Sequence, residues 1–346
     1  MPTQLSIKEN VQLAPFTTLG IGGAARFFVE ANSEEMLTVA IAFAEQRGLP
    51  QFILGGGSNV LVSDEGFLGL VIRVAIKGVE WGKEITVGAG EDWDGFVRQC
   101  VKRNLAGLEC LSGIPGLVGG TPVQNVGAYG QEVSETITKV RAFDRRSKQI
   151  VELSNAECGF TYRASIFNSV ERNRYVVLAV TYALRQGGEP ALRYPDVKNF
   201  FVGRNDQPSL AEVRQAVIEI RSRKGMVIVP DDADCRSAGS FFKNPVISAQ
   251  AFAKLEAAAD ERPTSFPAAN GNVKVPAAWL IERAGFKRGY AKGRAGISSK
   301  HTLAIINRGG ATANEVLDLV AEIQARVQAE FGVELLPEPV FVGFDS

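Results

Sequence analysis

The most informative segment of the chain is residues 112–130, SGIPGLVGGTPVQNVGAYG. It is rich in glycine, contains two prolines, and follows neither the helical nor the strand spacing of apolar residues. A loop of this length inside a compact domain is usually functional. Its backbone N–H groups, the amides of Gln124 and Asn125 and the ring of Tyr129 could together wrap a flat, polar cofactor. A compact surface loop without a ligand is the alternative.

A second glycine run, LGGGSN, occupies residues 54–59 and follows a predicted strand at 51–54. Three glycines allow backbone N–H groups to close on a diphosphate, with Ser58 and Asn59 as further donors. The run matches neither a phosphate-binding loop of ATPases nor the glycine fingerprint of a Rossmann fold. A plain turn is the alternative, but two glycine loops in one domain favour a dinucleotide such as FAD.

Regular elements are predicted on both sides of these loops. Apolar residues at helical spacing follow the candidate N-caps Ser33, Asp92, Ser209, Ser248 and Thr312. The pattern from 140 to 184 is mostly that of strands, and further strands are predicted at 71–74, 85–87, 303–307 and 335–342. Helices and strands therefore mix as in an α+β protein, with a domain boundary near residues 205–212.

The composition excludes several classes of protein. The chain has 346 residues, with 38 Lys and Arg against 38 Asp and Glu, so no global charge attracts nucleic acid or an anionic membrane. Four cysteines without a C-x-x-C pair and the single histidine, His301, do not form a zinc motif. The start of the chain does not resemble a signal peptide, and the longest apolar stretch, 175–184, is too short to span a bilayer. We expect a cytoplasmic protein with free thiols.

Three polar residues outside the loops are candidate catalytic groups. Arg163 lies in residues 160–167, beside a strand in the mostly strand-like stretch 140–184, and could pair with a substrate carboxylate, although a structural ion pair is the commoner role. Ser240, in SAGSFFKNP at 237–245, has no neighbouring base to make it a nucleophile, but it could donate a proton to a basic carbanion. Glu338 is held between two prolines on a stiff segment; an exposed loop glutamate is the alternative.

Taken together, these segments resemble the UDP-N-acetylenolpyruvoylglucosamine reductase family, the flavoenzymes of peptidoglycan precursor synthesis. The resemblance extends from about residue 17 to residue 342. The matching segments, in chain order, are TLGIGG (18–23), LGGGSN (54–59), GIPGLVGG (113–120), QNVGAYG (124–130), YRAS (162–165), GSFFKNP (239–245) and LPE (336–338). No single segment is decisive, but seven in this order are highly specific.

The resemblance implies an α+β fold with a two-part FAD-binding region of the vanillyl-alcohol-oxidase (PCMH) type and an α+β substrate-binding domain. The expected parts are an FAD-binding subdomain at 1–75, a second at 76–208 joined by the strand at 332–346, and the substrate-binding domain at 209–331. It also implies non-covalent FAD, NADPH as the reductant and UDP-N-acetylglucosamine enolpyruvate as the substrate. We expect a monomer without a metal, a nucleic-acid partner or a membrane partner.

The family's residues carry over onto matching positions. The resemblance implies that Arg163, Ser240 and Glu338 are catalytic. A hydride reaches the outer carbon of the enolpyruvyl group, and Ser240 protonates the inner carbon. Arg163 offsets the charge that grows on the substrate carboxylate, where Glu338 also forms a hydrogen bond. The implied FAD-binding residues are Gly55, Gly56, Gly57, Ser58, Asn59, Gly113, Ile114, Pro115, Gly116, Gly119, Gly120, Gln124, Asn125, Gly127, Ala128, Tyr129 and Tyr162. The implied substrate-binding residues are Tyr194, Lys224, Asn244 and Lys274.

The chain departs from the family pattern at two positions. Many relatives carry Lys-Leu-Pro-Asp before the serine segment, with the lysine toward the diphosphate, whereas Ile228 stands at that position here. We expect Lys224 to replace that lysine, with Lys274 as the alternative. Some relatives have tyrosine where Phe266 stands, so one phosphate hydrogen bond is expected to be missing.

Two rival functions remain open from the sequence. One is a flavin oxidase of the same cofactor fold; such enzymes often tether FAD through His or Cys, and the cofactor region here contains no histidine. The other is a catalytically silent UDP-sugar sensor, against which the intact Arg163, Ser240 and Glu338 argue.

Overall fold

The computed structural model describes residues 5–259 and 261–344. Contacts between residues divide them into two compact units. Unit 1 holds the residues up to Val11, Ala25–Gly57 and Leu68–Val227, and unit 2 holds Gln12–Ala24, Ser58–Phe67 and the residues from Ile228 onward. These units are not the three expected parts residue for residue: 209–227 lies in unit 1, and the C-terminal strand lies in unit 2. The expected domain boundaries stay a prediction.

Unit 1 is built on two sheets. The first has the order β1 (Lys8–Gln12), β2 (Ala24–Ala31), β5 (Phe67–Val74) and β3 (Gln51–Leu54). The second has the order β12 (Gln149–Ser154), β11 (Ile137–Asp144), β13 (Tyr175–Tyr182), β7 (Ile85–Gly88) and β6 (Val79–Glu80), with antiparallel neighbours throughout. One cluster of buried apolar side chains runs through both sheets.

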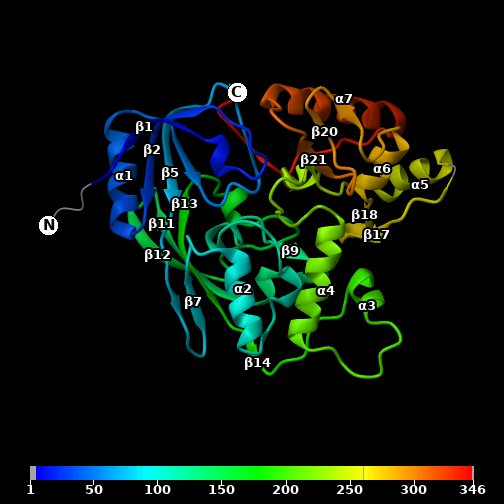
Figure 1. Ribbon diagram of the computed structural model, residues 1–346, viewed down its shortest axis with the longest axis horizontal. Helices are drawn as coiled ribbons and strands as arrows, with labels where there is room; N and C mark the ends of the chain where they lie inside the picture. The colour runs from blue at the N-terminus through cyan, green and yellow to red at the C-terminus, as the bar shows by residue number, and fades with distance from the viewer. Residues whose placement is uncertain (1–4, 260, 345–346) are drawn as a thin grey trace. The chain divides into compact units, whose positions relative to one another are not determined.

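The helices of unit 1 are α1 (Glu34–Gln46), α2 (Trp93–Lys102), α3 (Pro195–Phe200) and α4 (Leu210–Arg223). Its short pieces are η2 (Glu109–Leu111), η3 (Val118–Gly120), η4 (Val133–Glu135), η5 (Ile166–Asn168), and the strand pairs β8 (Leu105–Ala106) with β14 (Arg185–Gln186) and β9 (Gly127–Ala128) with β10 (Gln131–Glu132). Figure 1 shows α2 and α4 side by side, with the glycine-rich segment 112–130 beside them.

Local hydrogen bonds explain why the helices of unit 1 begin where they do. The Ser33 hydroxyl accepts the Met36 N–H, and the Asp92 carboxylate accepts the Gly95 N–H. Ser209 opens α4 in a capping box that includes Glu212. All three N-caps predicted for this unit are confirmed.

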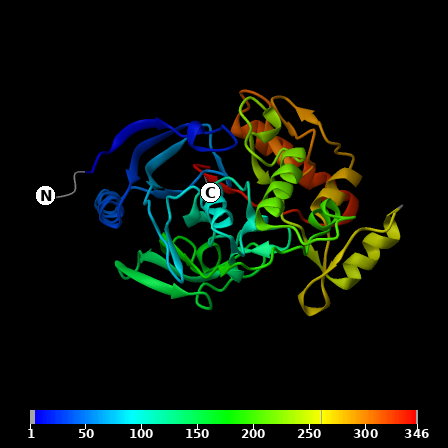
Figure 2. The same cartoon turned by 60° about the horizontal axis from the view of Figure 1, so that its bottom comes forward.

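Unit 2 holds a four-stranded sheet, β15 (Ser237–Ser240), β21 (Ala304–Asn307), β20 (Ala295–Ile297) and β19 (Ala291–Lys292), and a three-stranded sheet, β16 (Val246–Ile247), β18 (Val273–Lys274) and β17 (Phe266–Pro267). Strand β22 (Val340–Val342) pairs in parallel with β4 (Val60–Val62). The remaining elements are α5 (Ala249–Ala258), α6 (Ala277–Arg283), α7 (Ala313–Phe331), η1 (Ala14–Phe16), η6 (Ala233–Cys235) and η7 (Ala269–Gly271). In Figure 2, α5 and the three-stranded sheet form the yellow and gold part of the chain.

The long helix of unit 2 also follows its sequence signals. Thr312 and Glu315 form a capping box at the start of α7, and Gly332 ends the helix in the left-handed region at φ +66°. Val316, Val320, Ile323 and Val327 are buried on one stripe, as predicted.

Two strand predictions are wrong in part. Residues 160–167, within the stretch predicted as mostly strand, form a turn closed by a bridge between Thr161 and Ala164. Only Val340–Val342 of the predicted strand at 335–342 is regular, because Pro337 and Pro339 have no N–H to give to a ladder. The sequence analysis also missed α3.

Candidate active site

The two glycine loops touch each other inside unit 1. A side-chain carbon on Gly56 would lie 2.5 Å from the Cα of Gly116, so only glycine fits at this crossing. Gly57 and Gly116 adopt φ values of +65° and +131°, which residues with side chains rarely adopt. Backbone without side chains therefore lines the crossing, which is what close approach of a diphosphate requires.

The start of the second loop is fixed by the half-buried carboxylate of Asp94. The Gly113 N–H donates to Asp94 at 2.5 Å, and the same carboxylate receives both ends of the Arg214 guanidinium at 2.7 Å. Burial by itself would raise the pKa of Asp94, but the hydrogen bonds from Arg214 and Gly113 bring it below its usual value. The pair thus ties the loop to both α2 and α4.

Not every predicted cofactor residue of the loop is open to a ligand. The Gly119 N–H donates to the Ala89 carbonyl at 2.8 Å, and a side chain on Gly119 would overlap Ala89. Asn125 is 1% exposed, and its Nδ2 donates to Glu132 at 2.8 Å and to the Thr161 carbonyl at 3.1 Å. Gly119 and the Asn125 side chain therefore shape the loop, while Gly55 and Gly120 face open space.

Arg163 stands on a strained turn beside the same loop. Its φ of +55° lies in the left-handed region, which is uncommon for a residue with a side chain. Asn168 Nδ2 donates to the Arg163 carbonyl at 3.2 Å, and Arg163 Nη2 donates to the Gly127 carbonyl at 2.7 Å. The neighbouring Tyr162 is 41% exposed. These contacts hold the guanidinium on the glycine loop.

Two predicted substrate residues, Tyr194 and Lys224, meet around Tyr129. The rings of Tyr129 and Tyr194 pack edge to face with centroids 5.5 Å apart, and the Lys224 Nζ lies 5.7 Å from the Tyr129 ring. Lys224 also forms an ion pair of 2.6 Å with Asp196 in the first turn of α3. Burial is the largest single influence and lowers the pKa of Lys224, but the hydrogen bond to Asp196 and the electrostatic effects of Tyr129, Asp196 and Tyr194 together raise it above its usual value.

Arg221 was not predicted from the sequence; it is 9% exposed and lies on the inner face of α4. Its Nη2 donates to the Met226 carbonyl at 2.7 Å, whereas its buried Nε has no hydrogen-bond partner among the described residues. Burial lowers its pKa, although Tyr129 and Asp94 act in the opposite direction. A side chain on Gly113 would lie 3.5 Å from this Nε. The available signal was an arginine four residues after Val217, on the apolar face of the helix.

In unit 2, Ser240 directly follows an irregularity in its strand. Between Ser237 and Ser240 the pairing of β15 with β21 shifts register, with Gly239 at φ +76° and its N–H bonded to the Ser237 hydroxyl. Such bulges re-aim the side chain that follows them and are common next to active sites. Ser240 itself is half-buried, and a side chain on Gly239 would meet open space.

Glu338 is brought next to this strand by backbone pairing. The Glu338 N–H donates to the Phe241 carbonyl at 2.8 Å, and Phe242 forms an antiparallel bridge with Pro337. Asn59, a predicted cofactor residue, donates through Nδ2 to the Glu338 carbonyl at 3.3 Å. Ser240, Glu338 and Asn59 thus lie on adjoining segments of one unit, although they are far apart in the sequence.

The remaining predicted substrate residues also lie in unit 2. Asn244 Oδ1 accepts the Ala277 N–H at 2.9 Å and so caps α6. Lys274 is paired with Phe266 in the three-stranded sheet, and its Nζ lies 5.8 Å from the Phe266 ring. Within unit 2 the structure therefore joins Ser240 to Glu338, whereas Arg163, Tyr194 and Lys224 belong to unit 1.

The described residues contain no group of three or more His, Cys, Asp or Glu arranged to hold a metal ion, and none of their helices could cross a membrane. All four cysteines are buried and reduced.

Comparisons with known proteins fit this geometry. Residues 25–154 match the model of an FAD binding domain, and residues 230–342 match the C-terminal domain of UDP-N-acetylenolpyruvoylglucosamine reductase. The chain is 47% identical to the enzyme of that name from Thermobifida fusca, over 98% of both chains. It belongs to the UDP-N-acetylenolpyruvoylglucosamine reductase family. The reductase of Streptomyces coelicolor is 46% identical over 97% of this chain and 90% of that one.

A solved reductase structure supports the fold as well. The reductase of Thermus caldophilus superimposes with a TM-score of 0.68 at 29% identity and covers 98% of this chain and 100% of its own. The predicted family, the α+β fold class and the flavin-dependent oxidoreductase class are confirmed. The residues fit FAD in two respects: the crossing at Gly56 and Gly116 is a cradle that a side chain would fill, and the buried Nε of Arg221 lies next to Gly113.

Proposed function

We propose that the chain reduces UDP-N-acetylglucosamine enolpyruvate to UDP-N-acetylmuramate, with NADPH as the reductant and Ser240 as the proton donor. Family membership and the match of residues 25–154 to an FAD binding domain support the reaction class. The structural observation that carries the proposal is the bulge at Gly239. It changes the direction of the strand just before Ser240, next to the segment that contains Glu338.

The glycine loops are the proposed FAD site. The glycines at the crossing let backbone N–H groups approach the diphosphate, and Arg221 adds a positive charge beside Gly113. When bound, FAD supplies hydride transfer from NADPH to the outer carbon of the enolpyruvyl group. We propose that the association is non-covalent, because the cysteines are buried and His301 lies in unit 2.

Ser240 completes the reaction by protonating the inner carbon. Addition of a hydride beside a carboxylate leaves an enolate, which is basic enough to take a proton from a neutral hydroxyl. A serine without a base partner is therefore suited to this step. Glu338, on the adjoining segment, is proposed to donate a hydrogen bond to the developing charge from its carboxylic acid form.

Arg163 stabilises the charge on the substrate carboxylate. Its turn is fixed by Asn168 and its guanidinium by Gly127 before any substrate arrives. A preorganised cation in a partly buried site stabilises developing charge without further reorganisation. The planar guanidinium can also bind a carboxylate through two parallel hydrogen bonds.

Tyr194, Lys224, Asn244 and Lys274 are proposed to bind the UDP-sugar. The ion pair of Lys224 with Asp196 and the ring contact of Tyr129 keep Lys224 and Tyr194 together. Because Asn244 Oδ1 caps α6, its Nδ2 is the atom proposed to donate to the substrate.

The decisive experiment follows the flavin spectrum of the purified, FAD-loaded protein under nitrogen. NADPH should bleach the yellow colour, and the enolpyruvyl nucleotide should restore it in stoichiometric amount. In D2O the product should carry solvent deuterium at the inner carbon. A protein that cannot be loaded with FAD, or a reduced protein that only oxygen reoxidises, would contradict the proposal; the second outcome would indicate an oxidase.

A further inference from the structure

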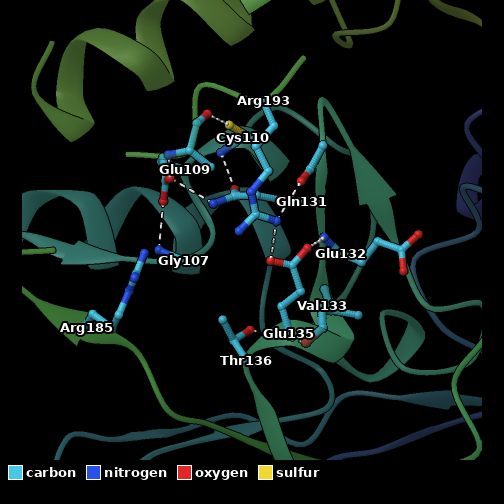
Figure 3. Close-up of polar contacts among 12 residues, drawn as sticks. Gly107, Glu109, Cys110, Gln131, Glu132, Val133, Glu135, Thr136, Arg185 and Arg193 are labelled. Atoms are coloured by element: carbon cyan, nitrogen blue, oxygen red, sulfur yellow. Dashed lines mark hydrogen bonds and ion pairs between the residues drawn. The ribbon is translucent and has the colours of Figure 1, made fainter. Parts of the chain in front are cut away.

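A buried carboxylate in unit 1 has no part in the proposed chemistry. Glu109, in η2, is 1% exposed. One of its oxygens accepts the Gly107 N–H at 2.8 Å, and the other accepts the Gln131 amide and the Ala191 N–H, each at 2.8 Å. Figure 3 shows the Glu109 carboxylate turned toward Gly107 and Gln131. A buried carboxylate is tolerated only when donors surround it in this way.

Two of the three donors, Gln131 and Ala191, adjoin segments that belong to the proposed site. Gln131 follows the glycine loop, and its Oε1 accepts the Cys110 N–H at 2.7 Å. Ala191 lies in residues 189–194, here called the arm, which ends at Tyr194. The Cys110 thiol donates to the Ala191 carbonyl at 3.2 Å, so both polar groups of this one residue are held by neighbours in η2.

The arm is joined to the glycine loop beyond Ala191 as well. Arg193 donates to the Gly130 carbonyl at 3.3 Å and pairs with Glu135 at 2.9 Å, although both of these side chains are largely exposed. A side chain on Gly130 would lie 2.9 Å from the Cβ of Arg193. The next residue, Tyr194, reaches Tyr129 of the loop.

We infer that Glu109 is a positioning residue, which fixes the arm to the glycine loop through Ala191 and Gln131 and thereby sets the place of Tyr194. The inference concerns the substrate end of the site and rests, for the role of Tyr194, on the proposed function. The burial of the Cys110 thiol, which raises its pKa to about 12, keeps that group protonated as a donor to Ala191.

The test compares Glu109→Gln with Glu135→Gln in the FAD-loaded enzyme. An amide at position 109 has only one acceptor oxygen, so its NH2 group faces either the Gly107 N–H or both the Gln131 amide and the Ala191 N–H. In either orientation η2 no longer holds all three donors, and the arm is fixed less firmly. We expect Glu109→Gln to raise the KM for the enolpyruvyl substrate about tenfold. Flavin reduction by NADPH should stay within about twofold of the unsubstituted rate, because it does not need Tyr194. Glu135→Gln removes the charge of the exposed ion pair with Arg193 and keeps an oxygen for the Glu132 N–H, so it should change neither.

Hydrogen exchange of single amides reports the clamp itself and does not depend on turnover. The Ala191 amide should exchange about tenfold faster in Glu109→Gln. The Gly187 amide, which donates to the Asn104 carbonyl and precedes the arm in the sequence, should exchange at its normal rate. In the unsubstituted enzyme an unprotected Ala191 amide would overturn the inference.

A double variant separates positioning from general stability. Glu109→Gln with Gln131→Glu restores the hydrogen bond between positions 109 and 131, but leaves the Ala191 N–H facing an NH2 group. We expect normal FAD content and thermal stability, with the substrate KM still raised. Equal loss in both half-reactions, or a normal KM with a fast-exchanging Ala191, would overturn the positioning role. Absence of turnover in the unsubstituted enzyme would instead refute the proposed function.

Discussion

Arg163, Asn125 and Tyr129 share a backbone conformation that residues with side chains rarely adopt. Their φ values are +55°, +44° and +48°. Such residues cost on the order of 1 kcal/mol each and persist only where the surroundings fix them. Here Asn125 donates to the Thr161 carbonyl at the start of the turn that carries Arg163. The strained backbone conformations therefore lie at the glycine loop and at the turn that carries the Arg163 guanidinium.

The role of Ser240 can be tested by separating the two half-reactions. Ser240→Ala should bind FAD and be reduced by NADPH at close to the normal rate, because no proton donor is needed there. Reoxidation by the enolpyruvyl substrate should slow by at least about 10²–10⁴-fold, the usual loss for a general acid. Stopped-flow absorbance of the flavin measures both rates.

Ser240→Cys serves as the matched control, since a thiol can still donate a proton. It should recover part of the lost reoxidation rate. If Ser240→Ala were reoxidised as fast as the unsubstituted enzyme, the proton would have to come from Glu338 or from water.

Lys224 is predicted to act on substrate affinity. Lys224→Ala should raise the substrate KM about ten- to a hundredfold, because a charge-assisted contact to phosphate contributes roughly 1.5–3 kcal/mol. Flavin reduction by NADPH should hardly change. Arg223→Ala is the control, because this neighbouring cation is exposed and pairs only with Glu219 among the described residues. An unchanged KM in Lys224→Ala would leave Lys274 as the candidate.

At the scale of single residues, the sequence indicates candidate residue types but not their conformation. The types and order of Arg163, Ser240 and Glu338 are visible in the chain, whereas the left-handed turn at Arg163 depends on Asn168 and Gly127. The burial of Arg221 depends on how α4 packs on the glycine loop. Such contacts are not encoded by local propensity, so the mostly strand-like pattern of 140–184 did not indicate the turn.

Helix α4 is the element that organises the cations of unit 1. Arg214 pairs with Asp94 of α2, Arg221 lies against Gly113, and Lys224 caps the helix beside Tyr129. The spacing of these three residues places them toward one side of the helix. One helix thus sets the positive charge along the predicted cofactor loop.

The pairing of α2 with α4 predicts a pH-dependent stability. The pKa of Asp94 is lowered in the folded protein, so its contribution is present above the unfolded value near 3.8 and is lost as the pH falls through the folded value. Asp94→Asn should lower Tm at pH 7 by about 2–4 °C, as expected for a partly buried pair that contributes about 1 kcal/mol. Thermal unfolding followed by circular dichroism between pH 7 and pH 3 should show the difference in Tm between the two proteins becoming smaller as the pH falls. A difference in Tm that grows toward low pH would contradict the stabilising role of the ionised Asp94.

Regular elements were predicted well where the signal is local. Ser33, Ser209 and Thr312 begin helices because each hydroxyl accepts the N–H three residues ahead. Helix α3 was missed because its six residues carry too little periodicity to stand out. Strand β22 is shorter than predicted because Pro337 and Pro339 have no N–H for a ladder, and its pairing with β4 is not visible in the local sequence.

For the whole molecule, we predict that the flavin is released completely on denaturation. All four cysteines are buried, and burial raises the pKa of Cys100, Cys110 and Cys158 to about 12, which suppresses the reactive thiolate. Acid should free all the FAD, and the mass of the denatured chain should be that of the unmodified polypeptide. Iodoacetamide should label the native protein slowly at pH 8 and all four thiols after unfolding. Flavin that stays with the denatured chain would refute this prediction.

The pairing of residues 336–342 with two earlier segments has a consequence for biosynthesis. Glu338 meets Phe241 through its N–H and Asn59 through its carbonyl, and β22 then lies along β4. During translation, the ribosome makes residues 336–342 after every segment they join, so a nascent chain can fold unit 1 while this part of unit 2 is still incomplete. With the role proposed for Glu338, turnover is expected only after synthesis has passed Val342. A chain that stalls earlier would contain the glycine loops of unit 1 but would lack the pairing of residues 336–342 with the strand of Ser240 in unit 2.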